Sequence, residues 1–162
     1  MAGYEFKEVY DGNDPYPYAV YANADNFRVV KLGAIPEIIQ IPTNGRVYEG
    51  TTNGFIVTTF RNASYIYEVY ATNIFTGSTT MISNINYDKL QVVDDGIVVY
   101  QDTTYKSKKE DGYNYAFFRA RIISYTTKNN ILKLECNSNF NLGEYGWISN
   151  NSYPSLITII QE

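Results

Sequence analysis

The chain has 162 residues, enough for one domain with its own core, and its 13 basic and 17 acidic residues give a net charge of −4. It contains no histidine and one cysteine, which excludes histidine-dependent catalytic triads, histidine-ligated metals and intrachain disulfides. The negative charge disfavours nucleic-acid binding, and the apolar runs are too short for a membrane-spanning helix.

The first residues, Met1 to Glu5, have neither a basic start nor an apolar stretch, so we expect no signal peptide. The sequence therefore predicts synthesis in a cytoplasm, with any extracellular role arising through assembly into a particle released by lysis. A turn-rich interruption at 11–17 sets the first strand candidate apart. We accordingly predict two parts, an N-terminal arm or edge segment at 1–25 and a β-sandwich domain at 26–162.

Four tyrosines near this arm are candidates for an assembly surface. Neighbouring prolines restrict the backbone there, which lowers the entropy lost when the arm docks on another molecule. The four residues are Tyr10, Tyr16, Tyr18 and Tyr21.

Alternation of apolar and polar residues dominates the rest of the chain and predicts β-strands. Asn44-Gly45, Asn53-Gly54 and Asp95-Gly96 can supply the positive φ angles of hairpin turns. We predict an antiparallel β-sandwich, jelly-roll-like, of about eight to eleven strands with little or no helix. The strands are expected at 27–32, 37–41, 46–49, 54–61, 65–72, 79–83, 89–93, 96–101, 115–125, 131–136 and 155–160.

A partial β-propeller-like interaction domain stays open as an alternative. Segments 55–82 and 97–134 loosely repeat a strand–turn–strand–turn–strand pattern, as propeller blades do. Two or three blades cannot close a propeller, so the sandwich is the preferred prediction.

The segment 115–125 is the longest predicted strand, and its two faces differ. One face is apolar, with Ala116, Phe118, Ala120 and Ile122, which is the half-buried pattern. The other face is mixed and holds the sharpest candidate contact site. Its guanidinium and aromatic groups could pair with a sheet carboxylate such as Glu68, form a protein interface or stack on a ligand. This face carries Tyr115, Phe117, Arg119, Arg121, Ile123 and Tyr125.

A second candidate contact site lies in the asparagine-rich stretch at 136–154. Tyr145, Trp147 and Tyr153 could grip a glycan by ring stacking, or Trp147 could fold down as a lid over the core. The lone Cys136 follows an alternating stretch and is interpreted as a small, half-buried side chain.

The sequence has 17 tyrosines, more than a core needs, because each buried hydroxyl requires a hydrogen-bond partner. Some tyrosines should therefore form outer contact surfaces. We find no phosphate-binding loop and no nucleophile elbow, and the two acidic clusters are interpreted as turns. No catalytic residue, cofactor or metal is predicted, and the protein is interpreted as a non-enzyme; a carboxylate-only hydrolase stays as a remote alternative.

Residues 39–48, Ile-Gln-Ile-Pro-Thr-Asn-Gly-Arg-Val-Tyr, resemble the opening of small β-sandwich heads on bacteriophage fibres. The resemblance extends over about 40–100 and includes the later strand–Asp-Gly–strand unit. It implies a virion component, often a trimer, that contacts a host glycan or another capsid or tail protein. It assigns no binding residue, because the tip loops of these heads share no motif.

The favoured hypothesis is a non-enzymatic virion structural or receptor-binding protein of a bacteriophage. Its tyrosine-rich surfaces would join subunits into a homo-oligomer, contact other virion proteins or hold a host glycan. The alternative is a free-standing carbohydrate-binding module, whose monomer would bind a glycan and lose affinity on Trp147→Ala.

Overall fold

A computed structural model describes residues 2–10, 18–32, 35, 37–106, 113–148 and 158–160. The described residues are almost entirely antiparallel β-strand, with one short 3-10 turn, η1 (Lys128–Asn130), and no α-helix. The predicted all-β fold with little helix is therefore confirmed.

Sheet A is a four-stranded antiparallel meander in which each strand pairs with the next along the chain. Its second hairpin is closed by the Asn23 side chain, whose Oδ1 accepts the backbone N–H groups of Asp25 and Asn26. The four strands are β1 (Glu5–Tyr10), β2 (Tyr18–Ala22), β3 (Asn26–Lys31) and β4 (Glu37–Pro42).

Sheet B is a second four-stranded meander. Its first hairpin turns at Asn53 and Gly54, both at positive φ (46° and 85°), as the sequence predicted for this Asn-Gly pair. The strands are β5 (Val47–Thr52), β6 (Phe55–Arg61), β7 (Tyr67–Asn73) and β8 (Thr79–Ser83).

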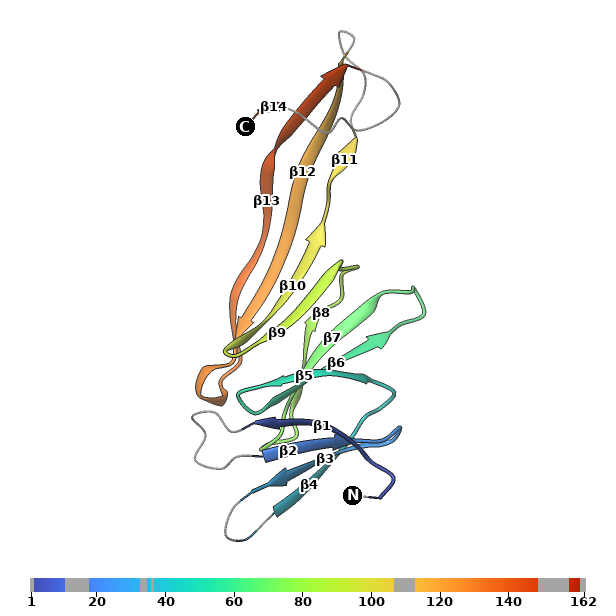
Figure 1. The fold of residues 1–162 in the computed structure, drawn as a ribbon, viewed down its shortest axis with the longest axis vertical. Helices are drawn as coiled ribbons and strands as arrows, with labels where there is room; N and C mark the ends of the chain where they lie inside the picture. Colours follow the sequence, from blue (N-terminus) through green and yellow to red (C-terminus); the bar gives the residue numbers. More distant parts are fainter. Residues whose placement is uncertain are drawn as a thin grey trace.

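Sheet C contains the remaining strands in the order β14-β13-β12-β10-β9, with β11 pairing β12 beyond the end of β10. Two of its strands are far longer than the others and form a hairpin, here called the ribbon, that rises beyond sheets A and B (Figure 1). The strands are β9 (Lys89–Val93), β10 (Gly96–Asp102), β11 (Tyr105–Lys106), β12 (Tyr113–Thr126), β13 (Lys133–Ile148) and β14 (Thr158–Ile160).

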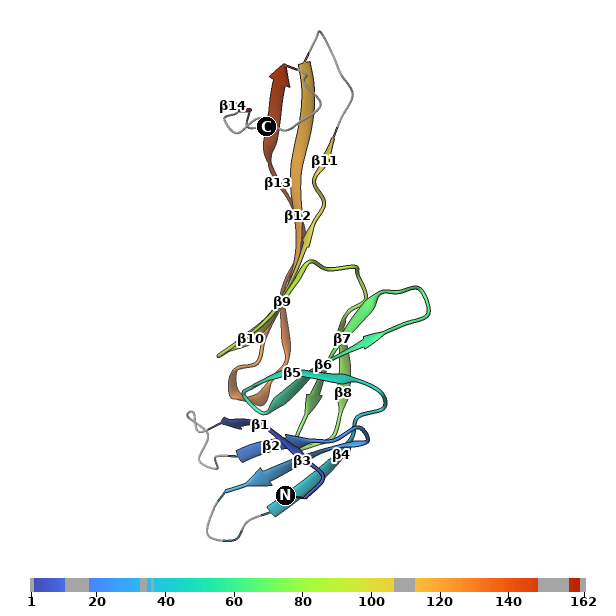
Figure 2. The ribbon, with the colours of Figure 1, turned by 45° about the vertical axis from the view of Figure 1, so that its right-hand side comes forward.

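The three sheets stack as layers with sheet B in the middle (Figures 1 and 2). Strand β6 explains why sheet B is the middle layer. Successive side chains on a strand point to opposite faces, and both faces of β6 are buried from Phe55 to Thr59. Ile56 joins the core shared with sheet A, which includes Val20 and Val29. Its neighbour Val57 joins the core shared with sheet C, which includes Val99. Sheet B is therefore covered on both sides from Phe55 to Thr59, whereas Phe60 and Arg61 at the end of the strand are exposed.

The number of strands and the connections between them differ from the sequence prediction. The described residues form fourteen strands, more than expected, because residues before 26 contribute β1 and β2 and the short β11 pairs with the ribbon. Within the sheets, hairpins join consecutive strands directly, instead of the Greek-key connections of a jelly roll. The predicted boundary between 25 and 26 falls in the turn between β2 and β3, inside sheet A.

The predicted positive φ at Asp95-Gly96 is wrong, since neither residue has one. Gly96 is needed there for another reason: a Cβ at this position would collide with the backbone carbonyl of Tyr125 on the neighbouring strand β12. The glycine therefore permits close strand approach and not a left-handed turn.

A partly buried carboxylate contact joins sheet A to sheet B. One oxygen of Glu8, Oε2, accepts hydrogen bonds from the Tyr48 hydroxyl (2.7 Å), the Thr51 hydroxyl (2.7 Å) and the Thr51 backbone N–H (3.1 Å). Hydrogen bonds to a charged acceptor are stronger than neutral ones. Strand β1 is thus fastened to β5 by three bonds on a single atom.

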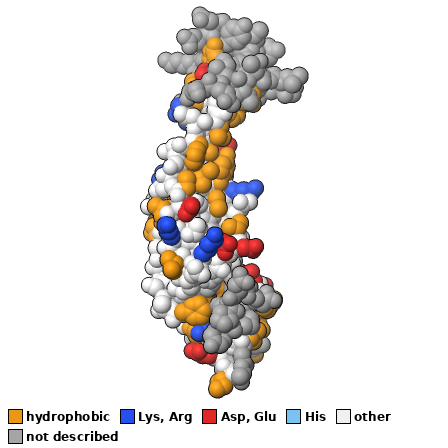
Figure 3. All heavy atoms as spheres, turned by 90° about the vertical axis from the view of Figure 1, so that its left-hand side faces the viewer, with side chains coloured by type: hydrophobic (Ala, Val, Ile, Leu, Met, Phe, Trp, Pro, Cys, Tyr) orange, Lys and Arg blue, Asp and Glu red, His pale blue; other side chains and the backbone are white. Residues whose placement is uncertain are grey.

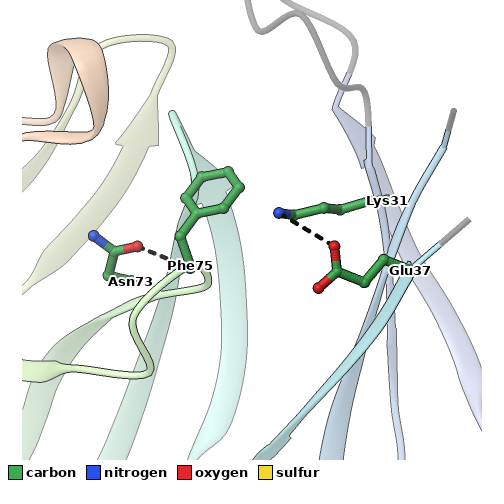
Figure 4. A network of polar contacts seen from close by, with 4 residues as sticks. All are labelled: Lys31, Glu37, Asn73 and Phe75. Atoms are coloured by element: carbon green, nitrogen blue, oxygen red, sulfur yellow. Dashed lines mark hydrogen bonds and ion pairs between the residues drawn. The ribbon is translucent and has the colours of Figure 1, made fainter.

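A second contact lies at the other side of the same layer boundary. The Lys31 ammonium pairs with Glu37 (3.8 Å) and lies 4.6 Å from the centre of the Phe75 ring, which follows sheet B strand β7 (Figure 4). The Asn73 Oδ1 fixes this loop by accepting the Phe75 N–H (2.9 Å). Lys31 therefore links the two sheets through a cation–π contact.

Replacing Glu8 by alanine should destabilise the protein by about 2 kcal/mol, because three donors of Tyr48 and Thr51 lose their charged acceptor. Chemical denaturation monitored by circular dichroism measures the free energy of unfolding. Glu5→Ala is the matched control on the same strand, since the Glu5 carboxylate is exposed and makes only a surface ion pair with Lys7. It should cost less than about 0.5 kcal/mol. Equal losses in the two variants would contradict the fastening role of Glu8.

Candidate functional site

The base of the ribbon is fastened to sheet B by asparagine and threonine side chains. In the turn between β12 and β13, Asn130 donates from Nδ2 to the Asn53 carbonyl (3.0 Å) and accepts from the Asn73 amide (2.8 Å). The hydroxyls of Thr127 and Thr52 lie 2.6 Å apart in a buried contact. These bonds fix the closed end of the hairpin and leave its other end to project.

The face of β12 that carries the predicted arginine site changes character along the ribbon. At the base, Ile123 on this face is buried in the core between sheets B and C, and Tyr125 packs against it. Farther along the same face lie Arg121 and Arg119, which are partly exposed. The alternation predicted from the sequence thus holds, but the core contacts belong to the mixed face.

The structure brings Tyr115, Phe117, Arg119 and Arg121 together on this face in the predicted order, by the strand register. Arg119 lies 5.9 Å from the centre of the Phe117 ring, and Arg121 donates to the Asn137 Oδ1 (3.2 Å) on β13. The suggested pairing with Glu68 is not formed. That carboxylate instead accepts hydrogen bonds from the Tyr70 hydroxyl and the Asn62 amide.

The apolar face of β12 lies on the opposite side of sheet C from the core. Phe118 on this face packs edge-on against Tyr145 of β13, with ring centres 4.6 Å apart. Beside it, Phe140 pairs with Ala120 and is 41% exposed, and Leu142 at an adjacent bulge is 54% exposed. Figure 3 shows apolar side chains gathered over the upper half of the molecule, where Figure 1 places the ribbon.

The second predicted site is only partly described. Tyr145 lies on the apolar side of the ribbon, away from Arg119 and Arg121. Trp147 lies on β13 opposite Asn114, with its side chain outside the described residues, and Tyr153 also lies outside them.

The four tyrosines of the predicted arm do not share one surface. Tyr18 is fully buried in the core between sheets A and B, and its hydroxyl accepts the Gly54 N–H (2.8 Å). Tyr21 packs edge-on against Phe6, with ring centres 5.5 Å apart. Tyr10 pairs with Tyr18 across β1 and β2, and Tyr16 lies outside the described residues. Tyr18 is therefore a core residue and not an assembly contact.

A cleft that sequence reasoning missed opens between sheet A and the start of β5. It has a volume of about 420 Å³, within the range of small-ligand sites. Its charged side chains are Glu5, Lys7 and Arg46. The remaining lining residues are Ala22, Asn23, Ala24, Phe27, Thr43, Gly45, Val47 and Tyr48.

Arg46 is held in a fixed position at one side of this cleft. Its Nε donates to the Thr43 carbonyl (2.9 Å) and its Nη2 to the Pro42 carbonyl (3.4 Å). Its guanidinium also lies 5.4 Å from the centre of the Tyr70 ring. Partial burial lowers the pKa of Arg46, and the nearby Tyr70 opposes that shift. Because arginine starts from a very high pKa, the guanidinium stays charged.

Arg46 also borders a shallower groove of about 280 Å³ on the outer side of sheet B, lined in addition by Asn44, Phe60, Glu68 and Tyr70. The Glu68 hydrogen bond raises the pKa of Tyr70, with partial burial adding to it. The same guanidinium thus lies between two hollows.

The cleft was missed because its parts come from four strands, β1, β2, β3 and β5, and from the turns before β3 and β5. Asn44 and Gly45 were correctly predicted as a turn with positive φ (52° and 76°). That turn fixes Arg46, but nothing local in the sequence shows that β1 with Lys7 lies alongside it. Only the pairing of sheets A and B creates the site.

No group of three or more histidine, cysteine, aspartate or glutamate side chains that could hold a metal occurs among the described residues. Within the same residues, no helix is both long and apolar enough to cross a membrane. Comparison of the chain with protein-family models, curated proteins and solved structures finds no match.

Tyr48 should make the protein sensitive to alkaline pH. Burial raises its pKa well above the ordinary value, and the hydrogen bond to Glu8 adds to the shift. A raised folded-state pKa gives stability that is complete below the unfolded-state pKa, about 10, and is lost as pH rises above it. Denaturation measured from pH 8 to 11 should show a shallower fall in the free energy of unfolding for Tyr48→Phe than for the unchanged protein. Equal slopes would contradict this role.

Proposed function

We propose that this protein is a non-enzymatic structural component of a bacteriophage particle that joins copies of itself through the ribbon. The observation that carries this proposal is the open outer edge of β13. Strand β14 pairs only with Glu144–Gly146, so the edge from Lys133 to Gly143 has no strand beside it among the described residues. Such an edge offers backbone donors and acceptors to a further strand.

The exposure of the ribbon supports an occupant for this edge. The other edge of the hairpin is paired with β10 and β11, whereas on the β13 side Phe140 and Leu142 are exposed. Covering these side chains and pairing the edge would stabilise the projecting part of the hairpin. A partner that does both must bring a strand and an apolar surface.

A second copy of this chain fits the edge. Residues Cys136 to Leu142 carry no charge, whereas protected edges usually carry lysine or other charged side chains. Antiparallel pairing of two identical edges about a twofold axis near Asn139 would place Asn137 opposite Asn141 of the other copy. Their amides can both donate and accept, so the pairing satisfies both sides.

The particle context is supported by the sequence alone. The resemblance of residues 39–48 to phage fibre heads motivates it, and the 17 tyrosines suit a protein that works through contact surfaces.

Asn139→Lys should break the self-association, because the edge-to-edge pairing would bring two like charges together at its centre. Sedimentation velocity of the unchanged protein should give a mass that is a multiple of the 18.5 kDa chain. The variant should dissociate at least about tenfold more readily. Asn84→Lys, at an exposed position outside the ribbon, is the matched control and should associate normally.

Thermal unfolding should show that both lysine variants stay folded. A monomeric unchanged protein, or an Asn139→Lys variant that associates as well as the control, would rule out this edge as the assembly surface.

A further inference from the structure

The cleft beside Arg46 offers hydrogen-bond donors, while two of its side-chain acceptors are already engaged and a third, the exposed Glu5 carboxylate, pairs with Lys7. The Asn23 Oδ1 accepts two backbone N–H groups of its own turn, and the Tyr48 hydroxyl is bonded to Glu8. The Lys7 ammonium and the Arg46 guanidinium, by contrast, are donors only. A ligand that fits this lining must therefore supply acceptors.

The charges in the cleft favour a negatively charged ligand. Lys7 and Arg46 contribute two positive charges against one negative charge on Glu5. The Lys7 ammonium pairs with Glu5 (3.3 Å), but this ion pair is weak because the Glu5 side chain is 77% exposed to water. Glu5 therefore competes little with an anionic ligand for Lys7. The whole protein carries a net charge of −4. A local excess of positive charge therefore distinguishes the cleft from the rest of the protein as a place for an anionic ligand.

The geometry of Arg46 suits a carboxylate in particular. Two backbone carbonyls and the Tyr70 ring fix the guanidinium, so little side-chain freedom is lost when it binds. A planar guanidinium matches a carboxylate with two parallel hydrogen bonds, which an ammonium cannot do.

The rest of the lining suits a compact carbon skeleton. Ala22, Ala24, Phe27 and Val47 contribute apolar surface beside the charged groups, and the Lys7 ammonium lies 6.0 Å from the Tyr48 ring centre. A sugar ring combines apolar C–H faces with polar groups, and the volume of about 420 Å³ accommodates a ligand of that size. We propose that this cleft binds an acidic saccharide, held by its carboxylate between Lys7 and Arg46.

The proposal is independent of the ribbon and is tested by isothermal titration calorimetry with defined sugars. Glucuronic acid and N-acetylneuraminic acid should bind, and glucose should bind at least about tenfold more weakly because it lacks the charge. Acetate should also bind more weakly, since it lacks the ring. Raising the salt concentration should weaken the acidic sugars, as expected for an exposed charge contact.

Lys7→Gln should weaken binding of the acidic sugars at least about fivefold. Lys31→Gln is the matched control, because Lys31 is also paired with a glutamate and placed by an aromatic ring but does not line the cleft. It should bind the sugars like the unchanged protein. Arg46→Lys keeps the charge, loses the two-point geometry and should weaken binding as well; circular dichroism checks that it is folded.

Several results would overturn the proposal. They are absence of binding by both acidic sugars, equal binding of glucose, tighter binding of inorganic sulfate or of an oligo-glutamate peptide, and equal losses in Lys7→Gln and Lys31→Gln. A monomeric protein that still binds acidic sugars would separate this proposal from the ribbon assembly, which would then fail alone.

Discussion

The burial of strand β6 on both faces is the constraint on which the rest of the structure depends. Because Ile56 and Val57 enter different cores, sheet A and sheet C must each cover one side of sheet B. Removing either outer sheet would expose a row of buried side chains to water. Both sides of sheet B must be covered. The first four strands therefore form a complete layer of the body, although turn-rich sequence interrupts them.

The same constraint decides where the protein leaves surfaces uncovered. Sheet B can cover only the base of the ribbon, near Ile123, so the longer part of β12 and β13 projects beyond any second layer among the described residues. At the other layer boundary, β1 and β5 meet through Glu8 and Tyr48. The cleft lies beside this contact and is lined by Lys7 of β1 and by Gly45 and Arg46 just before β5. Both candidate surfaces are therefore consequences of how three sheets of unequal length stack.

Local patterns in the sequence predicted most of the strands and two of the three Asn-Gly or Asp-Gly turns, because alternation and positive φ are local properties. The sandwich-like packing of sheets was predicted, but the third layer was not, although the buried run of β6 was a signal for a strand covered on both sides. Tyr18 was interpreted as a surface residue because nothing near it in the sequence identifies Gly54 as its hydrogen-bond donor. The cleft escaped prediction for the same reason. Contacts between residues about 40 positions apart depend on which sheets meet, and one sequence does not contain that information.

The two proposed surfaces would strengthen each other if both are used. The ribbon and sheet A lie at opposite ends of the long axis of the molecule (Figure 1), so association through the ribbon leaves the clefts of all copies open. A single cleft of this size, partly open to water and with one Arg-carboxylate contact, should bind a sugar weakly. The two clefts of such a dimer would bind a surface that displays many sugars more tightly than one cleft does, by about 10²–10⁴ when the spacing allows it. In the proposed dimer, contact through one weak cleft would stay reversible until the second cleft engages.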